Sequence, residues 1–197
     1  MADRVMTSDG VAALLRSDAW GSRGILRVCA GLTHEQFHQR FDIGLGSLHD
    51  TITHIISTMR RWTDRLAGRT PRPMLHAVPG HPHVSGEQVS RTPGELLSLL
   101  DEAERDLLET YERIKGDLSA KVLLDWPGQP GEVKRYTFTR AAVLAHVGSH
   151  GYHHRAQCLN MLRRLAAPVP GVTAGYPELS AVDWQAEVEC PPEVLRG

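Results

Sequence analysis

The feature that most constrains the fold is a periodic apolar stripe between Ser47 and Gly68. Six apolar residues there alternate at spacings of four and three: Leu48, Ile52, Ile55, Met59, Trp62 and Leu66. An α-helix has 3.6 residues per turn, so this spacing puts all six on one face, as in a bundle helix. Ser47 is a suitable N-cap with a carboxylate three residues later, and Gly68 suits a C-cap. The segment predicts a long helix that buries one face.

Three other segments carry helical signals. Residues near 8–30 begin with Ser8 or Asp9 as a possible cap and contain spaced apolar residues. The segment Thr92-Pro-Gly-Glu95 joins a threonine cap, a proline in the first turn and a glutamate at the third position, which predicts a helix start. The last long helix is expected from about Thr139 to Leu165. The fold class predicted from these segments is an all-α four-helix bundle.

The connections between these helices differ in character. Two β-type runs, Lys121–Trp126 and Glu132–Phe138, flank a turn rich in proline and glycine, which predicts a small β-hairpin before the last long helix. Residues 68–92 hold prolines, glycines and histidines and are predicted to form a long irregular connection. A shorter connector is expected over residues 33–46.

The length of 197 residues fits one domain with a tail. We place the bundle in residues 1–166 and a proline-rich tail that packs on it in residues 167–197, with a short helix around Glu178–Glu189. The composition, 41% hydrophobic and 23% charged, supplies a core of ordinary size for such a domain.

Charge and composition argue against several classes of function. The 22 basic and 23 acidic residues form no basic block, so no nucleic-acid partner is expected. No apolar run resembles a signal peptide or a membrane span, and three cysteines make no disulfide framework, so we expect a cytoplasmic protein without a membrane partner. Cys158 is interpreted as a core residue rather than a reactive thiol.

Histidines are the chemical signal of this sequence, which holds eleven of them. His146, His150 and His154 recur every four residues, and the apolar stripe of the last long helix runs through His150 and His154. Imidazoles one turn apart can bind one ion, whereas the alternative is a set of hydrogen-bonded core histidines. We favour a divalent-metal site with His150 and His154 as ligands.

Two histidines make an incomplete site, because zinc-like ions require three protein ligands and an open position, or four ligands. The pattern leaves the third ligand open among several residues: His49, His54, His81, His83 and His146. His54 lies on the flank of its helix, which would suit a cleft at the edge of the bundle. The pair His34 and His38 is not favoured, because no long helix is predicted around it.

Two segments resemble motifs of the DinB/YfiT-like family of helical metal-dependent proteins. Ser47-Leu-His-Asp-Thr-Ile-Thr-His54 is similar to the family's second-helix motif, which ends in a ligand histidine. His146-Val-Gly-Ser-His150-Gly-Tyr-His-His154-Arg-Ala-Gln157 is similar to its fourth-helix motif, His-x-x-x-His followed by Arg-x-Gln. The order of helices and the hairpin before the last long helix also agree.

The resemblance implies an up-down-down-up bundle, often a homodimer, with one Zn²⁺ or Ni²⁺ held by His54, His150 and His154. It implies supporting roles, in the site or in helix packing, for Arg155 and Gln157. His146 and His153 match histidines that are frequent in the motif but are not expected to ligate the ion.

Many members of the family carry an acidic residue in the turn after the first ligand. This chain has Ser57, Thr58 and Met59 there and so departs from the family. The family implies two chemistries, transfer of a low-molecular-weight thiol to an electrophile and metal-assisted hydrolysis. Hydrolysis needs a general base, so the missing acid favours thiol transfer, with a small thiol or electrophile as partner. A hydrolase and a non-catalytic metal-binding or stress-response protein remain the alternatives.

Other polar residues receive plainer interpretations. His76, His81 and His83 could cover the ion, but we interpret all three as solvated loop residues. Arg61 and Arg65 share the flank of His54 and could hold an anionic substrate, although a solvated helix face is the favoured interpretation.

Overall fold

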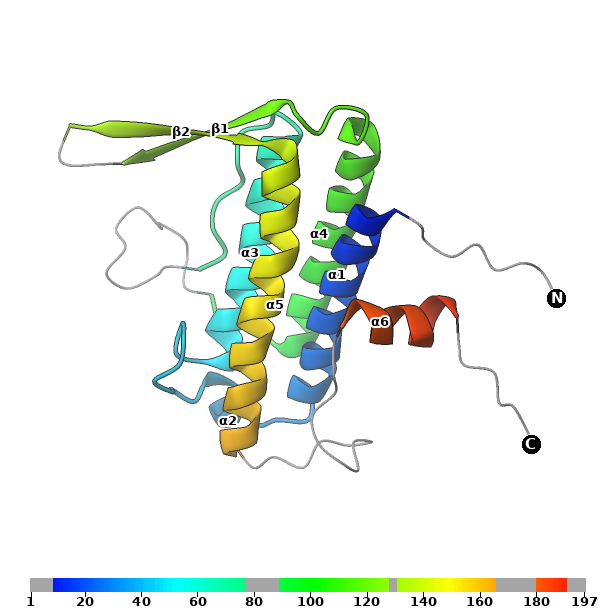
Figure 1. Ribbon diagram of the computed structural model, residues 1–197. Helices are drawn as coiled ribbons and strands as arrows, with labels where there is room; N and C mark the ends of the chain where they lie inside the picture. The colour runs from blue at the N-terminus through cyan, green and yellow to red at the C-terminus, as the bar shows by residue number, and fades with distance from the viewer. Residues whose placement is uncertain (1–8, 77–88, 128–130, 166–179, 191–197) are drawn as a thin grey trace, which may run out of the picture.

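Four long helices form the body of the protein in a computed structural model that describes residues 9–76, 89–127, 131–165 and 180–190. They are α1 (Gly10–Cys29), α3 (Leu48–Leu66), α4 (Pro93–Ile114) and α5 (Arg140–Leu165). Helices α1 and α5 run in one direction and α3 and α4 in the other (Figure 1). Both α4 and α5 pack against α1 and against α3. The predicted up-down-down-up four-helix bundle is confirmed.

The helix starts follow the capping signals in the sequence. Asp9 accepts hydrogen bonds from the first-turn amides of α1, and Ser47 accepts one from the amide of Asp50 at the start of α3. Thr92 and Glu95 form a capping box at the start of α4. Gly68 follows α3 with a φ of +70°, a conformation that glycine adopts without strain. These local signals therefore predicted the long helices well.

Apolar side chains from all four long helices meet in one core. Its largest fully buried members are Leu15, Ile25, Leu26, Leu48, Ile52, Ile56, Met59, Leu96, Leu100, Leu107, Leu144 and Met161. On α5 the sequence interpretation was wrong in one respect. Gly148, Gly151, Arg155 and Cys158 mark the buried side of the helix, so His150 and His154 lie half-buried at its edge rather than in the middle of the stripe.

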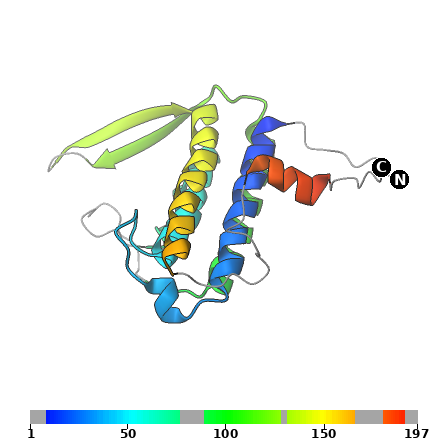
Figure 2. The same cartoon turned by 60° about the horizontal axis from the view of Figure 1, so that its bottom comes forward.

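The hairpin joins β1 (Lys121–Pro127) and β2 (Val133–Thr139) as antiparallel partners, with Lys121 opposite Thr139. It extends sideways from one end of the bundle in both views (Figures 1 and 2). The predicted hairpin is confirmed.

The shorter elements lie around the bundle. The helix α2 (His34–His38) occupies part of the predicted connector, where Thr33 and Gln36 form a capping box. Near the end of the chain, α6 (Ala181–Trp184) continues into a π-helical turn, Gln185–Glu189, and α6 packs against α1 (Figure 2). The domain boundary at residue 166 stays a prediction. No helix in the described ranges has the length and apolarity to cross a membrane.

Candidate metal centre

Three histidines from two neighbouring helices converge at the edge of the bundle. His54 comes from α3, and His150 and His154 come from adjacent turns of α5. One ring nitrogen of each lies within 4.8 Å of those of the other two, and the Nε2 atoms of His54 and His150 are 3.0 Å apart. The pattern had left five residues open as the third member of the group, and among the described histidines the geometry selects His54.

Gln157 orients the ring of His154. Its Oε1 atom accepts a hydrogen bond from Nδ1 of His154 at 2.8 Å, and its Nε2 atom lies 3.1 Å from Nε2 of His153. An amide oxygen accepts only, so Nδ1 of His154 must carry the proton and Nε2 keeps its lone pair. A metal-binding histidine needs this arrangement, in which the nitrogen that does not bind the ion donates to a fixed acceptor.

His76 makes the corresponding contact with His54. Its Nε2 atom lies 3.2 Å from Nδ1 of His54, and its side chain is buried with 4% exposed. If His54 donates from Nδ1, its Nε2 atom is free for an ion. The interpretation of His76 as a solvated loop residue is therefore wrong. His81 and His83 lie outside the described residues.

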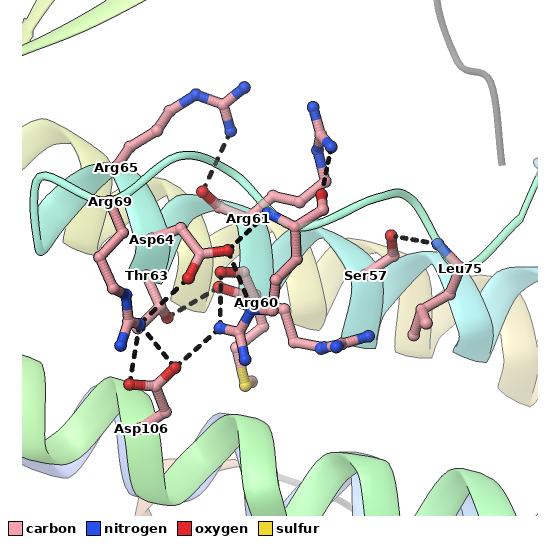
Figure 3. Close-up of polar contacts among 11 residues, drawn as sticks. Ser57, Arg60, Arg61, Thr63, Asp64, Arg65, Arg69, Leu75 and Asp106 are labelled. Carbon is pink, nitrogen blue, oxygen red and sulfur yellow. Dashed lines mark hydrogen bonds and ion pairs between the residues drawn. The ribbon is translucent and has the colours of Figure 1, made fainter.

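A polar network fixes the segment that carries His76 against the bundle (Figure 3). Asp64 of α3 accepts hydrogen bonds from the backbone amide and Nε of Arg72, both at 2.9 Å. Asp106 of α4 accepts from Arg72 and Arg69, each at 2.7 Å. Since Asp64 is buried, these charge-assisted bonds hold residues 69–72 to both helices.

Ser57 completes this attachment one turn beyond His54. Its Oγ atom accepts a hydrogen bond from the backbone amide of Leu75 at 3.1 Å, next to His76 (Figure 3). Ser57 lies in the turn after His54, where the family resemblance had implied an acidic residue. In this chain that position holds the loop instead of offering a carboxylate to the site.

The three rings are neutral at ordinary pH. Burial is the main cause that lowers the pKa of His54 to about 3, and repulsion from the neighbouring imidazoles adds to it. Burial likewise lowers the pKa of His150 to about 3, with His154 contributing, and burial lowers the pKa of His154. Neutral imidazole is the form that binds a metal ion, so the site does not depend on losing a proton first.

The other candidate ligands have different partners. His49 is buried, and its Nδ1 and Nε2 atoms pair with the Asp50 carboxylate at 3.0 Å and the Arg91 amide at 3.1 Å. His146 is exposed and packs edge-on against Trp62. His34 and His38 contact each other with tilted rings, and neither belongs to the group.

Arg155 serves helix packing rather than the metal centre. It is buried, forms an ion pair with Asp18 of α1, and donates to the backbone oxygen of Asp18 at 2.9 Å and to Ser22 at 3.3 Å. Burial raises the pKa of Asp18 to about 6, although Arg155 opposes the shift. Sequence reasoning missed Asp18, because nothing local signals a partner 137 residues away. Cys158 is fully buried, and burial raises the pKa of its thiol to about 12, which confirms it as a core residue.

The donor set fits a divalent ion. Three neutral nitrogens converge, two of the rings have a fixed contact at Nδ1, and a cavity of about 250 Å³ lies beside His54 and His150. No fourth histidine, cysteine or carboxylate within the described ranges joins the group. Three protein ligands with room for a fourth, non-protein ligand is the usual form of a catalytic zinc site.

Comparison with known proteins identifies the family of the chain and matches its fold. The model of the DinB family matches residues 1–187. A crystal structure of a DinB-like protein from Bacillus cereus superposes with a TM-score of 0.59 at 16% sequence identity, covering 85% of this chain and 98% of that one. No curated protein matches the sequence significantly. Because this family model matches nearly the whole chain, the protein belongs to the DinB family.

Proposed function

We propose that the protein is a metal-dependent enzyme that transfers a low-molecular-weight thiol to an electrophile, with zinc or nickel as its ion. The observation that carries the proposal is the convergence of His54, His150 and His154 next to a cavity that two of them line. A divalent ion held by three neutral imidazoles would act as a Lewis acid and lower the pKa of a thiol or of water.

The residues of the chain have separable roles in this proposal. His54, His150 and His154 supply the ligand nitrogens, and His76 and Gln157 keep two of the rings in orientation. Imidazole ligands suit zinc, and nickel would bind the same nitrogens at least as tightly. All three rings are half-buried, and those of His54 and His150 are accessible from the cavity.

Thiol transfer has more support than hydrolysis. Hydrolysis requires a group that takes a proton from water, and among the described residues that line the cavity none is acidic. The one described imidazole there besides His54 and His150 is that of His146. A purely structural ion also has less support, because the apolar core already joins α3 to α5 and the described residues include no fourth ligand.

The test is a transfer assay with zinc-loaded and nickel-loaded protein, using cysteine and glutathione as thiols and 1-chloro-2,4-dinitrobenzene as electrophile. We expect thioether formation that requires the ion and is lost in His154→Ala. The matched control is His34→Ala, which removes an exposed imidazole outside the group of three and should leave the rate unchanged. A metal-loaded protein that consumes no thiol at millimolar concentration would contradict the proposal.

A further inference from the structure

The cavity beside the three histidines has a second chemical feature, which is positive charge. His54, Thr58, Arg61 and Arg65 line it from one face of α3, at successive spacings of four, three and four residues. At 1.5 Å per residue, Arg61 lies about 10 Å along the helix from His54. One elongated small molecule can therefore reach both the arginines and the histidines.

The two arginines have no acidic partner within the described part of the chain. Arg61 donates from Nη1 to the backbone oxygen of Arg72 at 2.5 Å, and Arg65 donates from Nη1 to the backbone oxygen of Arg61 at 3.1 Å (Figure 3). The nearby carboxylate of Asp64 pairs with Arg69 and Arg72 instead. A guanidinium has five N–H donors, so each keeps several for another acceptor.

These cations are also partly removed from water, contrary to the solvated face favoured from the sequence. Both side chains are half-buried. Burial, with repulsion from Arg61, lowers the pKa of Arg65 to about 10, and burial lowers the pKa of Arg61. Asp64 attracts both cations from a distance, but neither forms an ion pair with a described residue. Two neighbouring half-buried cations of this kind form a site that a bound anion would stabilise.

The rest of the cavity wall is largely apolar. Trp62 of α3 and Trp126 of β1 face it, together with Leu124 and Met74. The guanidinium of Arg65 lies over the ring of Trp62, 5.0 Å from its centroid, which fixes that cation at the wall. An inorganic anion would leave this apolar surface uncovered, whereas an organic anion would use both parts of the cavity.

We propose that this cavity binds a small organic carboxylate with an apolar or aromatic body, its carboxylate held by Arg61 and Arg65 and its other end directed at the three histidines. The assignment of the second end as the reacting one rests on the proposed function. The carboxylate site rests on the arginines and the cavity alone.

The test measures binding of 2-naphthoate and of its neutral analogue 2-naphthamide by isothermal titration calorimetry, with inorganic phosphate as a third probe. We expect the wild-type protein to bind the carboxylate at least tenfold more tightly than the amide, and phosphate more weakly than the carboxylate. Equal affinity for acid and amide, tighter binding of phosphate, or no binding of the acid at millimolar concentration would overturn the assignment. This comparison needs no variant.

Variants then locate the site. Arg61→Gln and Arg65→Gln should each weaken naphthoate binding about tenfold or more and leave naphthamide binding unchanged. Arg60→Gln is the matched control, because Arg60 is on the same helix, loses the same charge and does not line the cavity. An unchanged affinity in both variants, or an equal loss in Arg60→Gln, would overturn the placement.

The same titrations on metal-free protein separate the two proposals. Arginine-dependent binding without any metal affinity would remove the proposed function and keep the carboxylate site. If the protein binds metal normally but its binding of naphthoate does not depend on the arginines, the carboxylate site is removed and the proposed function is kept.

Discussion

Helix α5 carries polar residues on two sides, and the fold uses them differently. Toward α1, the buried Arg155 pairs with Asp18, and a Cβ atom at Gly151 would overlap the Asp18 carboxylate. Toward α3, His150 and His154 are half-buried and turn ring nitrogens to a point shared with His54. The first pair balances opposite charges within the protein, although Asp18 Oδ2 and Arg155 Nε have no hydrogen-bond partner among the described residues. The three histidines bring together neutral rings with no opposite charge in their group, which suits a bound cation. An internal counter-charge thus separates the packing contact from the binding site on one helix.

The largest effect is expected on the packing side. Arg155→Ala should lower the free energy of unfolding by about 3–5 kcal/mol, because it leaves the Asp18 carboxylate buried without its partner. Urea denaturation of the metal-free protein measures this change. The double variant Asp18→Asn/Arg155→Met should recover part of the loss. A change under about 1 kcal/mol in Arg155→Ala would show that the pair contributes little.

On the binding side, removal of the His154 hydrogen-bond acceptor is expected to have the next largest effect. Gln157→Ala should weaken metal binding about 10- to 100-fold with little change in stability, because the ring of His154 loses the acceptor that orients it. A competition titration against a chelator measures the affinity. His153→Ala is the control, since it removes an exposed imidazole next to His154 and leaves the acceptor that Gln157 offers to His154. Equal losses in both variants would contradict this role.

A smaller loss of metal affinity is expected at His76. Its contact with His54 is longer, at 3.2 Å, so His76→Ala should weaken metal binding about tenfold. His76→Gln supplies an amide that can form the hydrogen bond in place of the imidazole, so this variant should restore part of the affinity for the metal. If neither variant alters the affinity in the same chelator competition, His76 only fills space beside the site.

The smallest effect is expected in the pH dependence of the metal-free protein. Burial lowers the pKa of His54 and of His150 to about 3, so below about pH 6.5 the unfolded chain takes up protons that the folded protein does not. Stability should fall as the pH drops from 6.5 toward 4, and less steeply in His150→Gln. The raised pKa of Asp18 acts in the opposite direction in both proteins and cancels in the comparison. Identical slopes would contradict neutral, buried rings.

The sequence predicted the features that depend on neighbours along the chain. The caps at Ser47 and Thr92, the stripe of α3 and the two strands of the hairpin all depend on residues close together in the chain, so their patterns were sufficient. The pairing of His150 with His154 followed from the same periodicity.

The remaining features depend on contacts between distant segments. The choice of His54 depends on how α3 faces α5, and the pattern alone left the third ligand open and ranked His54 no better than His146. The burial of His76 depends on Ser57 and Arg72 holding a proline-rich segment to α3, and composition gave no sign of it. Long-range pairings of this kind leave no periodic trace in one sequence.

The most direct test of the account is the metal content of untagged protein purified in parallel with the variants His54→Ala, His150→Ala and His49→Ala, measured by elemental analysis. We expect one zinc or nickel ion per chain in the wild type and in His49→Ala, and a loss of most of the ion in the other two. Equal metal content in all four proteins, or none in the wild type after incubation with zinc and with nickel, would contradict a shared ion at the three histidines.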